Sequence, residues 1–278
     1  MLLFLAGAAA WFAGDDLLAQ ESAPQKTKSK RPGYTDTPRI PGSAWRVHDA
    51  DRPAPPKVQP GPAPEKPLAP PEDAVVLFDG TSLEAWVGKD GKAAKWKLVD
   101  GAMEINKTGD IRTVQKFGSC QLHLEWRADP EDKGQGQQRS NSGVFLMGRY
   151  EVQILESHGS ETYVDGQAAS LYGQKPPYVN ACRPAGEWQT YDILFTAPKF
   201  DDDGSLAAPA KVTVLHNGVL AQHDVAYLGA TAHRRAPKYQ AHEAEAQLRL
   251  QDHGDKVRFR NIWIRPIERP AQAPLKRK

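Results

Sequence analysis

The sequence predicts an all-β protein in which two antiparallel sheets form a sandwich or jelly roll. Residues 120–129, CQLHLEWRAD, alternate strictly between apolar and polar side chains, as expected for a strand with one buried face. Asp100 and Gly101 join two alternating runs, which is a strong hairpin signal. No convincing helix of more than ten residues is found, and residues 233–247 are more typical of a loop than of a helix.

The first 72 residues predict export and a spacer. Leu2–Ala13 is an apolar run as long as the core of a signal peptide and too short to span a bilayer, so we assign residues 1–20 to a signal peptide of a periplasmic or secreted protein. Residues 21–72 hold more than half of the 23 prolines and predict a disordered, semi-rigid linker. Within it, residues 42–50 are expected to dock on the domain, because Trp45 is costly to leave in water.

We expect one folded domain without internal repeats over residues 73–268. A basic tail is expected over residues 269–278. The strand signals recur at short intervals, and about 200 residues suit a jelly roll of a dozen or more strands. They cover residues 74–80, 95–106, 120–129, 142–148, 149–157, 187–197, 211–220, 246–254 and 257–267.

Charge and cysteine content exclude some functions. A formal net charge of +2 gives no reason to expect a nucleic-acid partner, and no mature membrane span is expected. Cys120 and Cys182 are too few for a zinc cluster or a disulfide framework. Burial as small apolar side chains is favoured for both, with a single disulfide between them as the alternative.

Residues 149–157, RYEVQILES, carry carboxylates on a strand that is otherwise suited to burial. Alternation places Arg149, Glu151 and Gln153 on one face, which should line a wet surface, and residues 150, 152 and 154 in the core. A β-bulge near Leu155 would bring Glu156 to the polar face. The spacing resembles the Glu-x-Asp-x-x-Glu strand of retaining jelly-roll glycosidases, but Gln153 in place of the aspartate argues against an ordinary retaining glucanase. A solvated strand face is the alternative.

Two turns add candidate residues. Asn141 precedes the strand 142–148 in a turn where Gly143 can adopt a positive φ, and either a plain turn or a ligand contact explains it. Residues 250–265 place Asp252, His253 and Arg258 close together, and a histidine on a turn can serve as an acid or a base near neutral pH, although exposure alone is also common.

Six segments in order, LFDGTSLEAW, NSGVFLMGRYEVQILES, ASLYG, GEWQTYDILF, HNGV and LRLQDHGDKVRFRNIWIRPI, closely resemble the 3-keto-disaccharide hydrolase domain family over residues 73–268. The resemblance implies a concanavalin A-like jelly roll, export, and cleavage of glycosides oxidised at C3. A sugar 3-oxidoreductase acting upstream is a possible partner. A ketone at C3 acidifies the C2 proton, so a base, an acid and a donor to the ketone suffice for elimination of the C1 oxygen and later hydration.

The resemblance also suggests roles. Glu151, Gln153, Glu156 and Arg149 would lie on the concave face, and His253 would act as base or acid oriented by Asp252. Arg258 or Arg149 would polarise the ketone, and Glu125 would reach the site only if its strand lies next to it. Tyr172, Trp188 and Trp86 are candidates for stacking on a sugar, or are core residues. A divalent metal is possible, but no ligand spacing is diagnostic. The alternative function is a non-catalytic carbohydrate-binding module on a proline-rich stalk.

Overall fold

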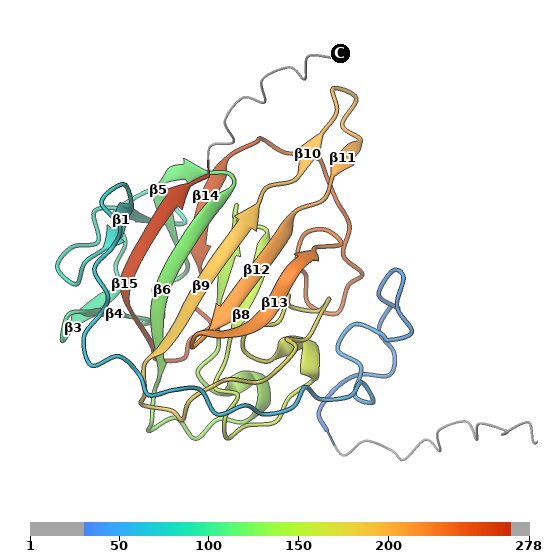
Figure 1. The fold of residues 1–278 in the computed structure, drawn as a ribbon, viewed down its shortest axis with the longest axis horizontal. Coiled ribbons are helices and arrows are strands. Elements are labelled where there is room, and N and C mark those ends of the chain that lie inside the picture. Colours follow the sequence, from blue (N-terminus) through green and yellow to red (C-terminus); the bar gives the residue numbers. More distant parts are fainter. Residues whose placement is uncertain (1–30, 268–278) are drawn as a thin grey trace, which may run out of the picture.

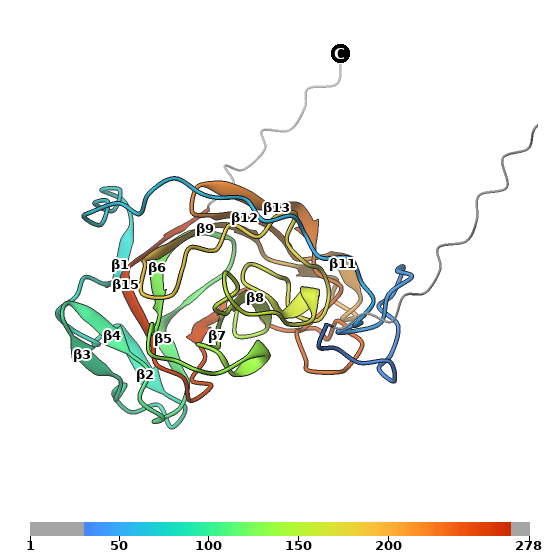
Figure 2. The same ribbon diagram turned by 90° about the horizontal axis from the view of Figure 1, so that it is seen from below.

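The computed structural model describes residues 31–267, which form two antiparallel sheets packed face to face (Figures 1 and 2). The predicted signal peptide at 1–20 and the tail at 269–278 lie outside the described residues. Apolar side chains from both sheets form one core between them, in which Trp86, Trp126 and Tyr191 are among the largest fully buried residues. The predicted all-β jelly roll is therefore confirmed.

The large sheet has eight strands, and Figure 1 views it nearly face-on. Its hydrogen-bonded order is β13 (Val219–Ala226), β12 (Lys211–His216), β9 (Gln189–Thr196), β6 (Cys120–Ala128), β15 (Val257–Pro266), β4 (Ala102–Glu104) and β3 (Lys97–Val99), and β1 (Val75–Phe78) also pairs with β15.

The small sheet lies on the other side of the core and has five strands. Its order is β2 (Trp86–Gly88), β5 (Ile111–Phe117), β14 (Ala246–Leu250), β7 (Ser142–Leu146) and β8 (Tyr150–Ile154). A separate hairpin joins β10 (Lys199–Phe200) to β11 (Leu206–Ala208), and two short 3₁₀ turns are η1 (Gly136–Gln138) and η2 (Val164–Gly166). In Figure 2, β9, β12 and β13 of the large sheet arch over β7 and β8.

Local sequence explains the hairpins. Asp100 and Gly101 both have positive φ, at 51° and 70°, and close the predicted β3–β4 hairpin. Such paired positive angles match the right-handed twist of the flanking strands. The predicted loop at 233–247 is also confirmed up to Ala246, where β14 begins.

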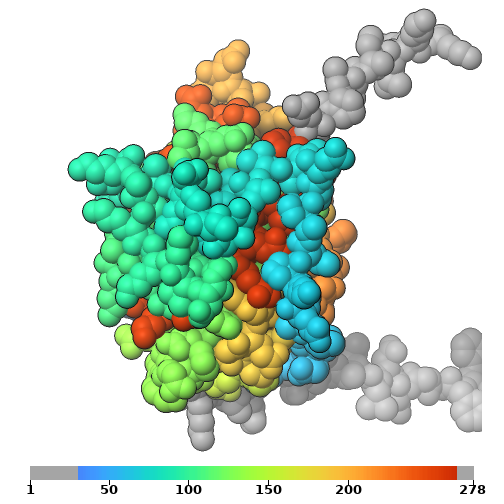
Figure 3. All heavy atoms as spheres, turned by 90° about the vertical axis from the view of Figure 1, so that its left-hand side faces the viewer, coloured from blue at the N-terminus to red at the C-terminus, as the bar shows by residue number. Residues whose placement is uncertain are grey.

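The proline-rich segment differs from the expected disordered linker where the structure describes it. Residues 31–52 fold against the lower end of the sandwich, with Val47 and His48 fully buried, whereas Trp45 is only half-buried. Residues 42–50 thus dock as expected, but through other side chains. Further along, Val58 donates its backbone N–H to the Asn180 carbonyl oxygen at 2.9 Å. Figure 3 shows the later part of the segment lying beside the C-terminal strand β15.

Both cysteines are buried and free, so the single-disulfide alternative is wrong. Burial raises the pKa of each thiol to about 12, which leaves both as unreactive core residues. Within residues 31–267 no helix has the length and apolar character that a membrane span requires.

Candidate active site

A pocket of about 400 Å³ opens on the face of the small sheet that points away from the core. Strands β7, β8 and β14 contribute its floor, and its walls come from the loops before β7 and after β8, β13 and β14 and from the segment before β1. The volume lies within the range of small-ligand sites, roughly 300–1,000 Å³. Of the predicted site residues, the pocket brings together Asn141, Glu151, Gln153, Tyr172 and His253.

Strand β8 provides the floor through the predicted alternation. Tyr150, Val152 and Ile154 pack in the core, while Glu151 and Gln153 face the pocket. Gly143 pairs with Gln153 across the β7–β8 ladder. A Cβ at Gly143 would lie 2.3 Å from Glu151 Oε1.

This glycine therefore leaves room for the carboxylate, which explains its presence better than the positive φ expected from sequence. Gly143 belongs to strand β7, and the positive φ of the preceding turn is at Ser140. The expectation for Gly143 is wrong because the constraint on it comes from the neighbouring strand and not from its own backbone.

Glu151 is the one carboxyl group among the described residues that line the pocket. Its side chain is almost entirely removed from water, and burial raises its pKa to about 8. Arg249 on β14 opposes this rise only in part, because its guanidinium is paired with Asp110 at 2.5 Å and lies 3.5 Å over the Phe145 ring. A carboxyl group with a pKa near neutrality can both take up and release a proton at physiological pH.

The Gln153 amide can take two orientations, and each suits a different protonation state of Glu151. In one, Nε2 donates to the side-chain oxygens of Gln137 and Asn141, both at 3.2 Å, but the amide oxygen then faces the Ser142 carbonyl oxygen and Glu151 Oε1, so only a protonated Glu151 can supply it with a donor. In the other, Nε2 donates to Glu151 Oε1 at 2.9 Å and to the Ser142 carbonyl oxygen at 3.0 Å. A neutral amide thus serves Glu151 in both states, which an ionised aspartate would not.

An ordered chain of polar aromatic groups forms one wall. The hydroxyls of Tyr163 and Tyr172 lie 2.7 Å apart, and the Tyr172 hydroxyl lies 2.9 Å from His233 Nδ1. Burial, with smaller contributions from the nearby His48 and Arg234, lowers the pKa of His233. The lowered pKa favours the neutral imidazole of His233, and the hydrogen bond with Tyr172 holds the ring in place.

His253 lines the pocket from the turn after β14 and is exposed. The predicted orienting role of Asp252 is wrong. Its two carboxylate oxygens accept backbone N–H groups of Gly109 and Gly254, both at 2.9 Å, so Asp252 fixes the turn and not the imidazole.

Residues 73–265 match the family model of the 3-keto-alpha-glucoside-1,2-lyase-like domain. The chain belongs to this family. A curated relative, the 3-keto-disaccharide hydrolase of Bacteroides thetaiotaomicron, is 25% identical in an alignment of length 249 that covers 70% of this chain and 78% of the relative.

Two crystal structures of glycosyl hydrolase candidates from Parabacteroides distasonis extend the comparison. One is 44% identical with a TM-score of 0.71 and covers 78% of this chain and 93% of its own. The other is 22% identical with a TM-score of 0.50, covers 71% and 95%, and shows the same fold. Membership in the lyase-like family and a glycosyl hydrolase-like architecture are thus established.

Two predicted residues of the lyase-like domain lie next to β8 but outside the pocket. Glu156 is not brought back by a bulge, because the chain leaves the strand at Ile154 and turns. Its carboxylate accepts the backbone N–H groups of His158 and Gly159, at 2.9 and 2.8 Å, and lies 2.9 Å from Arg139 Nε. Arg149 is exposed and donates to the Met147 carbonyl oxygen at 3.1 Å.

Three further predicted residues belong to the outer face of the large sheet, on the other side of the core. Arg258 Nε pairs with Glu104 at 2.7 Å and lines a separate cavity. Glu125 pairs with Arg260 at 2.7 Å, and that guanidinium lies 4.1 Å over the Trp188 ring. From sequence they were candidates, Glu125 only on the condition that its strand lies next to the site, because alternation tells which face of a strand a side chain takes but not the sheet to which the strand belongs.

Trp86, the remaining stacking candidate, is a core residue of the lyase-like domain. It is 1% exposed and donates its indole N–H to the Leu77 carbonyl oxygen at 2.8 Å. The alternative of burial was therefore correct for this residue.

Sequence reasoning missed several pocket residues. Arg249 and Gln251 alternate with Leu248 and Leu250 along β14, so the rule applied to β8 was sufficient to find them. The others lie in loops or in the proline-rich segment, where no periodicity marks them: Tyr34, Gln137, Tyr163, Thr231 and His233. Among residues 31–267, no three His, Cys, Asp or Glu side chains gather as metal ligands.

Proposed function

We propose that this lyase-like domain cleaves 3-keto-glycosides by removing the C2 proton, eliminating the C1 oxygen and then adding water. The observation that carries the proposal is a glutamate, Glu151, with a pKa of about 8, buried on the floor of an open pocket that also holds two imidazoles. A proton-transfer reaction at a carbon acid needs such a group. The name of the matched family describes the same 1,2-elimination.

The chemistry requires little from the protein beyond proton transfer. The C3 ketone lets a base take the C2 proton as its electrons form an enolate. Collapse of the enolate breaks the C1–O bond, and the departing oxygen takes up a proton. Water then adds to C1 of the resulting enone and a proton returns to C2, so the net reaction is hydrolysis to a 3-keto sugar and a free alcohol.

Glu151 is the proposed base at C2. Its raised pKa makes the carboxylate a stronger base than an exposed one, and Gln153 can accept a hydrogen bond from the protonated product of this step. His253 is the proposed proton donor to the leaving oxygen, because it lines the same pocket from the turn after β14. Arg249 takes the place assigned from sequence to Arg258 or Arg149, at the ketone oxygen.

The test is turnover in D₂O of a 3-keto-disaccharide and its unoxidised parent by the full chain. We expect cleavage of the oxidised substrate alone, with deuterium at C2 of the released 3-keto sugar, and loss of both in Glu151→Gln. Cleavage of the parent without deuterium at C2 would contradict the elimination. Binding of either sugar without release would favour the carbohydrate-binding alternative.

Such a substrate presupposes an enzyme that oxidises the C3 hydroxyl of the glycoside. Export to the periplasm or beyond, inferred from residues 1–20, would place the cleavage outside the cytoplasm. Fractionation of cells that express the full chain tests this second point, and retention in the cytoplasm would refute it.

A further inference from the structure

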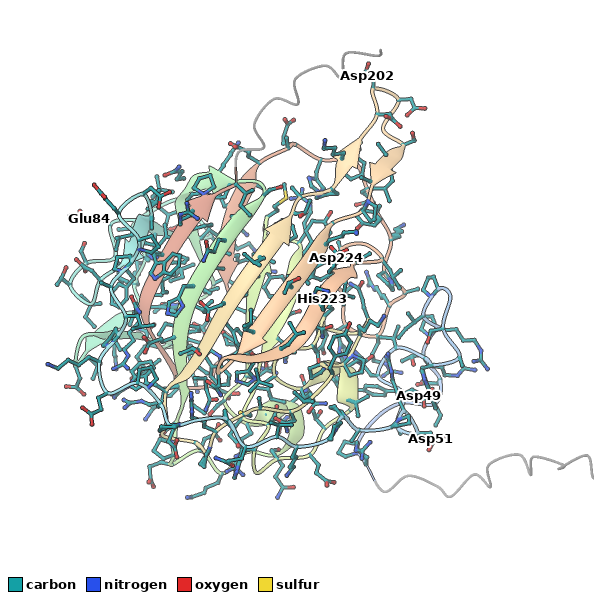
Figure 4. The ribbon with its side chains drawn as sticks, in the orientation of Figure 1. Asp49, Asp51, Glu84, Asp202, His223 and Asp224 are labelled. Atoms are coloured by element: carbon teal, nitrogen blue, oxygen red, sulfur yellow. The ribbon has the colours of Figure 1, made fainter. Side chains whose placement is uncertain are left out.

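One wall of the pocket comes from outside the part of the chain that matches the family model. The match begins at residue 73, but Tyr34 lines the pocket together with Tyr163 and His233. Residues 34–52, here called the N-terminal strap, lie at the lower right of Figure 1, and Asp49 and Asp51 mark the strap in Figure 4. The pocket is therefore incomplete without this segment.

The strap is anchored by a buried histidine. His48 is fully buried and donates its backbone N–H to Asp165 Oδ2 at 2.9 Å, while Nδ1 lies 3.1 Å from Asp165 Oδ1. The imidazole packs on Tyr163, with ring centroids 4.0 Å apart, and on His233 at 5.2 Å. Arg52 adds a hydrogen bond to the Gln174 carbonyl oxygen at 3.2 Å. Contacts of this kind fix the strap on the back of the aromatic wall.

Tyr34 is held at the front of that wall. Its backbone N–H donates to the His48 carbonyl oxygen at 2.8 Å, and the Arg234 guanidinium covers its ring at 4.3 Å. Arg234 is in turn fixed by Asp36, with distances of 2.7 and 2.9 Å to the two carboxylate oxygens. The Tyr34 ring meets Tyr163 and His233 at centroid distances of 6.0 and 5.9 Å.

The polar floor and the aromatic wall divide the pocket. Glu151 and Gln153 rise from β8, while Tyr34, Tyr163 and His233 meet one another on loops. Aromatic rings with polar edges suit a pyranose, which offers an apolar C–H face for stacking and hydroxyls around its rim. With C2 of a keto-sugar ring at Glu151, as the proposed function requires, the ring would occupy the floor and the group attached at C1 would extend beyond it.

We propose that Tyr34 and its neighbours form the subsite for the leaving pyranose, so that the strap selects disaccharides over glycosides with small leaving groups. This inference rests on the proposed function for the position of C1. It assigns the strap a role in substrate specificity and leaves the proton-transfer step to Glu151 and His253.

The experiment compares the full chain with its Tyr34→Ala, Tyr34→Leu and Tyr34→Phe variants on a 3-keto-disaccharide and on methyl 3-keto-glucoside. Stacking on one ring is worth roughly a ten-fold change in affinity. We expect Tyr34→Ala and Tyr34→Leu to raise KM for the disaccharide about ten-fold with kcat little changed, and to leave the methyl glycoside within about two-fold. Tyr34→Phe keeps the ring and should resemble the wild type. Tyr34→Leu retains apolar volume and serves if Tyr34→Ala unfolds the strap.

An equal loss on both substrates, or no loss on either, would overturn the subsite. Failure of the proposed function is distinguished by titration calorimetry of the same variants with the unoxidised disaccharide and with methyl glucoside. Suppose that no 3-keto-glycoside is cleaved. Tighter binding of the disaccharide than of methyl glucoside by the wild type, lost in Tyr34→Ala and Tyr34→Leu, would still support the subsite. No binding of either sugar to the wild type would overturn it as well.

Discussion

Glu125 on β6 and Glu151 on β8 are both buried glutamates that point away from the core of the sandwich, one from each sheet. Their exposed fractions are 1% and 3%. Burial alone would raise the pKa of both, but the nearby His123 and hydrogen bonds from Asn261 and Arg260 outweigh it and lower the pKa of Glu125. Glu151 lacks such compensation, and its pKa rises to about 8.

The difference shows that partners, rather than burial, separate a structural carboxylate from a reactive one. The network around Glu125 continues through His123 to Asp192, at 2.7 Å, and raises the pKa of His123 to about 9. Every charge there has an opposite charge within reach. In the pocket, Arg249 pairs with Asp110 and not with Glu151, so the Glu151 carboxyl has no ion-pair partner of its own.

The largest expected effect is on catalysis. Replacing a group that transfers a proton removes roughly 10²–10⁴-fold in rate, so Glu151→Gln should lower kcat/KM for a 3-keto-disaccharide by about 10³-fold. Glu125→Gln is the matched variant on the other sheet and should change kcat/KM per folded molecule by less than about three-fold, because that side chain is far from substrate. Steady-state kinetics of the two variants measures both values of kcat/KM. Similar losses in the two variants would contradict the comparison.

The next effect is on stability, with opposite signs for the two glutamates. The folded pKa of Glu151, about 8, exceeds the ordinary 4.5, so the stability associated with its bound proton is complete below pH 4.5 and is lost as pH rises through 8. Glu151→Gln cannot ionise. The free energy of unfolding of Glu151→Gln, relative to that of the wild type, should therefore increase between pH 5 and 9 by on the order of 3–5 kcal/mol.

For Glu125 the folded pKa is lowered, so its contribution is present above the unfolded pKa and is lost as pH falls through the folded value. Glu125→Gln leaves Arg260 and His123 without their carboxylate and should cost about 3 kcal/mol at pH 7, with a smaller deficit in acid. Urea unfolding at several pH values measures both trends. A parallel pH dependence for the two variants would show that partners are not what separates them.

The sequence predicts the site residues whose direction follows from alternation along a strand. It placed Glu151 and Gln153 correctly, because a buried neighbour on each side fixes the parity of a strand. It failed at Glu156, where the chain leaves the strand and local backbone N–H groups capture the carboxylate. It could not distinguish Glu125 from Glu151, because Arg260 and Asn261 lie 135 and 136 residues further along the chain. Tyr34 lies in a segment whose prolines predict disorder, and its anchoring depends on Asp165, which no local pattern connects to it.

A smaller effect is expected from crowding the Glu151 carboxylate without removing it. Gly143→Ala would place a Cβ 2.3 Å from Glu151 Oε1 and 2.9 Å from Phe145 Cε2, so the carboxylate must move. A displacement of about 1 Å can cost 10²-fold in rate, and overpacking about 1–3 kcal/mol in stability. Gly88→Ala on β2 is the control, since its Cβ would meet the side-chain oxygen Asp90 Oδ1 at 3.2 Å and the Lys92 carbonyl oxygen at an ordinary 3.8 Å. Kinetics of Gly143→Ala that match those of Gly88→Ala would mean that the position of the carboxylate is not critical.

The smallest effect is expected at Glu156, a third buried glutamate, which tests whether partners or proximity to β8 determine reactivity. It lies two residues beyond the end of β8 and is 1% exposed, yet two backbone N–H groups donate to its Oε1, and Arg139 Nε forms an ion pair 2.9 Å from its Oε2. Glu156→Gln keeps an oxygen for those N–H groups and should change kcat/KM by less than about three-fold, with a stability loss of about 1–2 kcal/mol. A rate loss as large as that of Glu151→Gln would restore the two-carboxylate site predicted from sequence. A small one would leave Glu151 as the carboxylate on which the reaction depends, because its partners do not hold it in one state.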